Sequence, residues 1–467
     1  MLRSLFVLSI LLPGVVLAFT SRFRALLLYT WFAFFRPQEW LWANIRSFRL
    51  SLVIGLILVV PAIFTGVFPN VTHPLSIGTL FFLLSGLLAQ TNAVDPATGW
   101  HWIDFQAAMT VFCLLTITIV RTPRQLMLVI AVAAGSLTFF SAKAGFMSLI
   151  SGGKQYADGL AGAFVDNNGW AVGIVMTIPF LVALAQNAEL TFGGIVPKPA
   201  IRWVRFFWYL TIPLSAYTIV STFSRGGFLA LVAILLTYAL FHPRRIRFVL
   251  IMGLLGGLLF VIPLPEGYLD RISTIQQLQE DVETPRGDVT TGRFYFWGVA
   301  MTMVQDYPLG VGMRNFYAHY GAYDIRGGAY GRRRDVHSSH FQVLVEQGYL
   351  GAAVWIWLFA YSLLTARRVR KRSRTPGLAP ADAKLMETLP LAIVVSMAGF
   401  CVGGGAVSMA LNDLTWLTFA LLASLDLLSK SICMEATAGG RSAIAGPGAQ
   451  AGKWGRAFGA RGSAASV

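Results

Sequence analysis

The chain has 467 residues, and only 12% of them are Asp, Glu, Lys or Arg, against about 25% in a typical soluble protein. With 56% hydrophobic residues, its apolar surface has to be buried in lipid, which excludes soluble enzymes and predicts a polytopic integral membrane protein. The net charge of +16 does not indicate a nucleic-acid partner, because most basic residues lie in short loops between apolar stretches. Three scattered cysteines exclude a disulfide framework.

Apolar stretches follow one another along most of the chain, and most are near the ~20 residues that a helix needs to cross a bilayer. They lack the ten-residue alternation of a membrane β-barrel. We therefore predict an all-α, polytopic helical bundle with about 12 (12–13) transmembrane helices. The stretches are 2–19, 24–35, 50–66, 76–92, 100–120, 125–150, 168–187, 203–222, 226–241, 247–263, 348–366, 388–411 and 414–429.

Basic residues between Arg367 and Arg374 predict the orientation, because short loops rich in Lys and Arg stay in the cytoplasm. Counting backwards from this loop also places the loops around Arg244, Arg202 and Arg121 inside. The same count puts 264–347 outside, as one large periplasmic loop with amphipathic helices. We divide the chain into N-terminal transmembrane helices (1–150), central transmembrane helices (151–263), the periplasmic loop (264–347), C-terminal transmembrane helices (348–430) and a disordered cytoplasmic tail (431–467).

The first hundred residues fit this count less well. If every stretch crosses, the loop that contains Arg36 and Arg49 lies outside, so we expect one stretch not to cross. The short run 24–35 is the candidate, as a re-entrant or interfacial segment. Residues 1–19 resemble a signal peptide, but a retained first helix is the favoured interpretation.

Charged residues in and beside the spans direct attention to the external side. Arg225, in Ser-Thr-Phe-Ser-Arg-Gly-Gly, is expected at the external start of a helix, where a guanidinium suits a phosphate. The alternative is an interfacial arginine that reaches lipid headgroups. Arg293 lies beside aromatic residues at helical spacing, which indicates an amphipathic surface helix, and Trp297 is interpreted as a packing residue.

Two histidines precede the span at 348–366. His337 and His340 have side chains whose pKa values near neutrality suit removal of a proton from a hydroxyl group. Their spacing would also suit two ligands of one metal, but no third ligand follows, so no metal site is expected. For a single histidine, a structural role as a helix cap is the alternative.

Together these segments resemble a known family. His337-Ser338, nine residues and then Gly348-Tyr349-Leu350-Gly351 is similar to the signature of the O-antigen ligase and polysaccharide polymerase superfamily, membrane glycosyltransferases of the GT-C type. The resemblance covers roughly 160–430. Two segments, Arg36-Pro37-Gln38-Glu39-Trp40 and the run from Arg271 through Ile275, are most similar to O-glycosylation ligases of the exosortase A-associated branch. Asp166-Asn167-Asn168 resembles an external-loop motif of one branch. Other segments in the family's order are Ser224-Arg225-Gly226-Gly227, Gly292-Arg293 with Trp297, and Pro308-Leu309-Gly310-Val311-Gly312.

The resemblance implies an inverting transfer of a glycan from undecaprenyl pyrophosphate to an acceptor hydroxyl, without metal or cofactor. It would take place at the periplasmic face of a bacterial inner membrane. The acceptor is a glycolipid, a protein or a polysaccharide. A polysaccharide polymerase and, in another class, a lipid or glycan transporter are the alternatives. The implied catalytic residues are His337, Arg225 and Arg293, and the implied substrate-binding residues are Arg225, Arg293, Asn168, Arg314 and His340.

Overall fold

The computed structural model describes residues 2–40, 49–153, 164–241, 246, 264–265, 267–268 and 292–444. Within these ranges the regular structure is helical, apart from one isolated bridge between Gly193 and Val196. The predicted stretch 247–263 lies outside the described residues. The all-α fold is confirmed for the described part of the chain.

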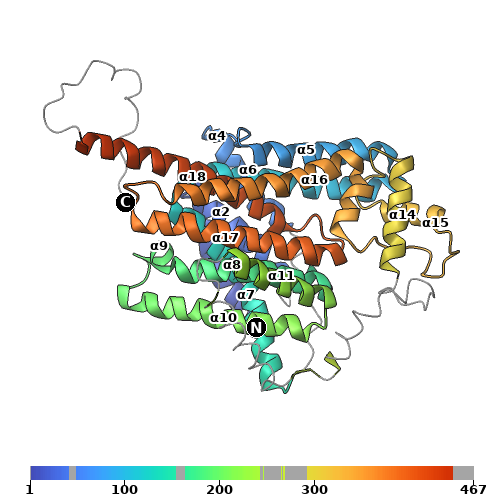
Figure 1. Ribbon diagram of the computed structural model, residues 1–467, viewed down its shortest axis with the longest axis horizontal. Coiled ribbons are helices and arrows are strands. Elements are labelled where there is room, and N and C mark those ends of the chain that lie inside the picture. The colour runs from blue at the N-terminus through green and yellow to red at the C-terminus, as the bar shows by residue number, and fades with distance from the viewer. Residues whose placement is uncertain are drawn as a thin grey trace, which may run out of the picture.

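Sixteen α-helices and three short 3-10 helices make up the described structure (Figure 1). They are α1 (Leu2–Ala18), α2 (Arg22–Phe35), α3 (Pro37–Trp40), α4 (Leu50–Phe64), α5 (Pro74–Ala89), η2 (Gln90–Asn92), α6 (Pro96–Ile119), α7 (Pro123–Ile150), α8 (Asn167–Gln186), α9 (Ala188–Phe192), η4 (Lys198–Ala200), α10 (Ile201–Ser221), α11 (Arg225–Phe241), α14 (Arg293–Asp306), α15 (Phe316–Tyr323), α16 (Ser339–Arg372), α17 (Pro380–Gly403), η7 (Gly404–Ala406) and α18 (Asp413–Ile444).

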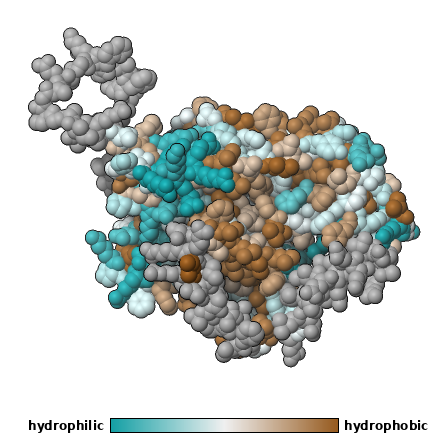
Figure 2. Space-filling view, in the orientation of Figure 1, coloured by the Kyte–Doolittle hydropathy of each residue, from teal (hydrophilic) through white to brown (hydrophobic). Residues whose placement is uncertain are grey.

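Seven of these helices are long and apolar enough to cross a membrane, and α1, α4 and α11 are shorter apolar helices. The surface agrees with a membrane protein, since hydrophobic residues cover the middle of the molecule and hydrophilic ones gather at its left-hand end (Figure 2). The multi-pass membrane protein predicted from composition is thus supported. The predicted count of about 12 spans stays a prediction.

The long helices run roughly parallel or antiparallel, so the bundle has two ends (Figure 1). At one, which we call the site end, α8, α11, α16 and α18 begin and α7 ends. At the other, the opposite end, α2, α7, α10 and α17 begin. Helix α14 crosses the site end, next to α15 (Figure 1).

Side-chain caps explain where several helices begin. Asp95, Thr122, Asp166 and Ser338 each accept a hydrogen bond from a backbone N–H in the first turn of the helix that follows. Such caps satisfy amides that have no partner within the helix. The capped starts of α8 and α16 lie at the site end, so the residues beside Asp166 and Ser338 are held in defined positions.

The predicted re-entrant run at 24–35 is helix α2, and it joins the two ends of the bundle. Its first residue, Arg22, lies within 3.5 Å of the Thr65 carbonyl at the end of α4. Arg36, which follows its last residue, forms a 2.9 Å ion pair with Asp413 at the start of α18. With 14 residues, α2 is shorter than the ~20 residues that a crossing needs, and the re-entrant or interfacial interpretation stays a prediction. Arg36 at the site end is thus paired with the carboxylate of Asp413. The positive-inside count considers only basic residues and does not include this partner.

The predicted disordered tail overlaps a described helix. Helix α18 continues past 430 to Ile444. Apolar residues up to Cys433 still pack against the core, which explains the extension. The rest of the tail, 445–467, lies outside the described residues.

Glycines join α16 to the loop that follows α14. Helix α16 is broken at Gly348 (φ 67°, ψ −168°), and Gly310 also has positive φ (93°). A Cβ on Gly348 would lie 2.2 Å from the Pro308 oxygen, and one on Gly310 would lie 2.5 Å from the Glu346 oxygen. Three backbone hydrogen bonds close the junction: Val311 N–H to Val345 O (3.0 Å), Gly312 N–H to Glu346 O (3.1 Å) and Tyr349 N–H to Pro308 O (3.0 Å).

Replacing Gly348 by alanine is expected to destabilise the protein by about 3 kcal/mol, because the new methyl group meets backbone and the backbone stays left-handed. Thermal unfolding of the purified protein in lipid nanodiscs measures this. Gly298→Ala is the control, since a Cβ there meets nothing within 4 Å. Equal unfolding temperatures for the two variants would contradict the junction described above.

Candidate functional site

The start of α11 is fixed against the start of α8. The Ser224 hydroxyl donates to Asn168 Oδ1 (2.8 Å) and accepts from the Gly227 N–H (3.0 Å), which caps α11. A Cβ on Gly227 would lie 2.5 Å from the Ala171 Cβ, so only glycine allows this approach. Arg225 is buried at the resulting junction, with a relative exposure of 9%. The structure thus places the candidate residues Asn168 and Arg225 together.

Helix η7 connects this junction to the start of α16. A Cβ on Gly226 would lie 3.1 Å from Ala406, and one on Gly404 would lie 3.3 Å from the Ser339 hydroxyl. Ser339 in turn donates to the Val407 carbonyl at 2.7 Å. The first turn of α11 and the first residue of α16 are therefore held around one short segment at the site end.

Helix α14 places Arg293 above the start of α16. Trp297 stacks on Phe341 with ring centroids 5.1 Å apart, and Phe296 lies 5.8 Å from the His337 ring. Phe296 and Val336 belong to a separate hydrophobic cluster at the site end, which holds α14 in place. Trp297 is thus a packing residue. The same turn of α14 begins with Arg293, which is thereby placed near His337.

His337 has an unusual backbone and a mixed electrostatic environment. Its φ is +50°, a left-handed conformation that costs free energy in a non-glycine residue and often occurs at functional sites. Burial lowers the pKa of the imidazole below its ordinary value. Asp335 and Asp166 oppose this effect, whereas Arg293 adds to it. The imidazole is therefore neutral at pH 7, the form that accepts a proton.

Asp335 is anchored on both carboxylate oxygens. Its Oδ1 accepts from the Ser408 hydroxyl at 2.9 Å, and its Oδ2 lies 3.3 Å from Arg314 Nη1. Arg314 also has positive φ (56°) and lies over the Trp102 ring at 5.1 Å. The candidate residue Arg314 thus contacts a carboxylate that acts on His337. Sequence reasoning gave Asp335 no role, although its position two residues before His337 was the available signal.

His340 has a different environment from His337. Its Nδ1 accepts from the Trp355 indole N–H at 3.1 Å, and its Nε2 lies 2.9 Å from the Cys401 carbonyl oxygen. Both ring nitrogens thus have partners on α16 and α17. These contacts indicate that His340 holds α16 against α17. They do not connect His340 to Arg293, Asp335 or His337.

The electrostatic contribution of Asp335 leads to a pH-dependence prediction. If neutral His337 is the base, kcat/KM falls as the pH drops through its pKa, which lies below the ordinary histidine value of about 6.5. Asp335→Asn removes a charge that raises this pKa, so the acid limb should move to lower pH. Asparagine still offers an oxygen to Ser408. A pH profile of kcat/KM in both proteins tests this, and an unchanged limb or a shift to higher pH would contradict it.

One comparison with known proteins covers this part of the chain. Residues 210–356 match the family model described as O-antigen ligase. The match runs from α10 into α16 and includes Arg225, Arg293 and His337. No curated protein matches the chain. The match and the apolar helices together identify a multi-pass membrane protein with an O-antigen-ligase-like region.

Proposed function

We propose that this protein is a ligase that moves a glycan from undecaprenyl pyrophosphate to an acceptor hydroxyl, with inversion and without metal. The main support is one juxtaposition: the first turn of α14, which begins at Arg293, packs through Phe296 against the half-buried imidazole of His337 at 5.8 Å, and Asp335 precedes that histidine by two residues. A proton acceptor beside a guanidinium suits a reaction that creates negative charge on a leaving group. The branch associated with exosortase A stays part of this proposal.

The two arginines act on the leaving group. As the bond between the anomeric carbon and the pyrophosphate oxygen breaks, negative charge grows on that oxygen. Guanidinium groups fixed in a buried or half-buried position stabilise this charge more in the transition state than in the ground state. Arg225 is held by the junction of α8 and α11, and Arg293 by the packing of α14. Neither needs to reorganise when the charge appears.

His337 acts on the acceptor. Its neutral imidazole removes the hydroxyl proton while the acceptor oxygen forms a bond to the anomeric carbon. Attack from the face opposite the pyrophosphate inverts the configuration. Asp335 stabilises the imidazolium that forms, and Ser408 and Arg314 hold that carboxylate. Asp335 is therefore a positioning residue.

The orientation follows from where the basic residues lie. Arg121 follows α6, Arg202 lies in the first turn of α10, and Arg370 lies in the last turn of α16, all at the opposite end of the bundle. Under the positive-inside rule this end faces the cytoplasm. The site end then faces the periplasm, where we propose that the donor and the acceptor meet.

Arg293→Lys is expected to lower kcat by about ten- to a hundredfold, because an ammonium cannot make the planar two-point contact of a guanidinium. The positive charge beside His337 remains, so the acid limb of the pH profile should stay in place. Arg333→Lys, at an exposed arginine of the same external segment, is the matched control. Turnover equal to that of the control would reduce Arg293 to a packing residue.

One reconstitution distinguishes the candidate functions. Purified protein in liposomes receives undecaprenyl-pyrophosphate glycan and an acceptor, with chelator present. A ligase releases the carrier and glycosylates the acceptor, whereas a polymerase lengthens the carrier-linked glycan without a second acceptor. A transporter moves the carrier across the bilayer and retains this activity after His337→Ala. A strict requirement for a divalent ion would contradict the proposed mechanism.

A further inference from the structure

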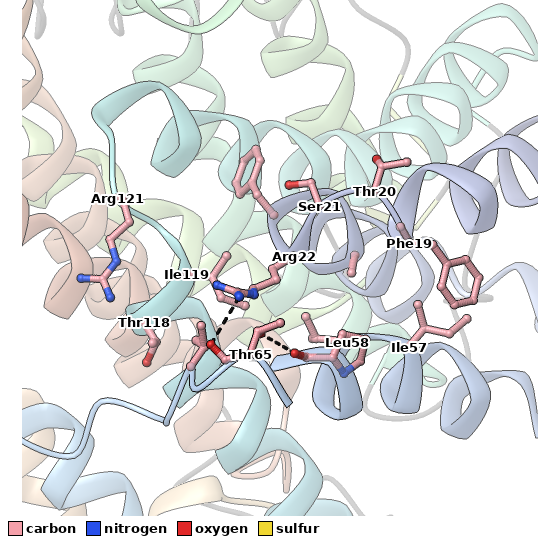
Figure 3. A pocket seen from close by; sticks show the side chains of 15 residues that line it. Phe19, Thr20, Ser21, Arg22, Ile57, Leu58, Thr65, Thr118, Ile119 and Arg121 are labelled. Atoms are coloured by element: carbon pink, nitrogen blue, oxygen red, sulfur yellow. Dashed lines mark hydrogen bonds between the residues drawn. The ribbon is translucent and has the colours of Figure 1, made fainter. Parts of the chain in front are cut away.

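A cavity of about 530 Å³ lies at the opposite end of the bundle, far from His337. It is formed where α1, α4 and α6 end and where α2 begins (Figure 3). These helix ends meet the loop that follows α6, which contains Arg121. The proposed transfer reaction uses none of these residues.

The polar part of the cavity wall is cationic. Arg22 and Arg121 line it together with the hydroxyl side chains of Thr20, Ser21, Thr65 and Thr118, and none of the described lining residues is a carboxylate. The one contact of the Arg22 guanidinium that Figure 3 marks is a long hydrogen bond of 3.5 Å to the Thr65 carbonyl. Two guanidinium groups beside hydroxyls therefore face a cavity with no acidic partner in its described wall.

The rest of the wall is apolar. Ile57, Leu58 and Pro61 of α4 line the cavity opposite Phe19, whose side chain is 69% exposed. Helices α1 and α4 are themselves apolar, and both end at this cavity. A site with cations at its end and apolar helices along its sides matches a ligand that has an anionic head and a hydrocarbon body. A soluble anion would use only the cationic part.

We propose that this cavity binds the phosphate of an anionic phospholipid in the leaflet at the opposite end. Arg22 and Arg121 hold the phosphodiester, and the Ser21 hydroxyl donates to one of its remaining oxygens. The hydroxyls of Thr20, Thr65 and Thr118 donate to backbone carbonyls instead. The acyl chains lie along α1 and α4. Basic pockets between transmembrane helices recognise lipid headgroups in this way. The bound lipid fills the cavity and holds together the helix ends that line it, which belong to α1, α2, α4 and α6.

The test uses the full chain and phosphatidylglycerol as the probe. The wild type, Arg22→Gln, Arg121→Gln and the double variant are reconstituted in nanodiscs of phosphatidylcholine with or without phosphatidylglycerol. Thermal unfolding and native mass spectrometry measure stabilisation and retained lipid. Arg202→Gln is the control, because Arg202 is exposed at the same end but does not line the cavity.

Phosphatidylglycerol should raise the unfolding temperature of the wild type and of Arg202→Gln and remain bound to both. Each cavity variant should bind it about tenfold more weakly, and the double variant should lose the stabilisation. Inorganic phosphate alone should not replace the lipid. Equal lipid retention by the double variant and the control would overturn the proposal. Full stabilisation by inorganic phosphate would also overturn it, because the site would then recognise the anion without the lipid.

Discussion

His337→Asn is expected to lower glycan transfer by about 10²- to 10⁴-fold, the usual contribution of a positioned general base. Asparagine tolerates the left-handed backbone that His337 adopts, so the fold is preserved while the proton acceptor is lost. His337→Ala should have the same effect on transfer, with some added backbone strain. Transfer is measured as release of the lipid carrier by purified protein in liposomes.

A second histidine at the same end serves as the control. His101 is exposed in the first turns of α6 and has no part in the candidate site, so His101→Asn should keep normal turnover. Both variants should remain in the membrane and unfold at similar temperatures. Near-normal transfer by His337→Asn would remove the general base from the mechanism, whatever the effect on stability.

Arg225→Ala is expected to lower kcat by about 10²- to 10³-fold, comparable to the loss of one fixed donor to a developing oxyanion. Arg225 is buried where α11 begins, so its loss affects a charge that the fold holds in place. The effect should appear mainly in kcat, because the phosphate oxygens gain charge as the glycosidic bond breaks. Steady-state kinetics with varied donor concentration separates kcat from KM.

Removal of a buried guanidinium also lowers the stability of the fold, so Arg225→Lys is the second variant. Lysine keeps the charge and much of the volume, and its kcat should lie between those of the alanine variant and the wild type. Arg202→Ala, at the opposite end, tests for a general effect of removing arginine. If Arg225→Lys is stable and fully active, or if Arg225→Ala changes only KM, Arg225 does not stabilise the leaving group.

Much of the fold could be predicted from composition and periodicity. The all-α membrane class follows from apolar length alone, and several predicted stretches differ by only a few residues from helices such as α6, α7 and α8. The ion pair between Arg36 and Asp413 could not be predicted, because it joins residues that are 377 positions apart. No local pattern shows such a partner.

The candidate site was only partly predictable. Residue chemistry singled out Arg225, Arg293 and His337, but it could not show that Asn168 is hydrogen-bonded at the start of α11. The role of Asp335 depends on Ser408, which reaches it from beyond α17. The motif alone does not explain why positions 310 and 348 are glycine. In the structure, each lies so close to the backbone around the other that a Cβ atom would not fit. Long-range contacts of this kind are set by tertiary packing.

The most direct measurement is a cryo-electron microscopy map of the protein in nanodiscs with bound undecaprenyl pyrophosphate. The proposed mechanism predicts pyrophosphate density at the site end, within hydrogen-bonding distance of Arg225 and Arg293, with His337 facing the position of the first sugar. Pyrophosphate bound at the opposite end, or bound with His337 directed away from it, would contradict the mechanism.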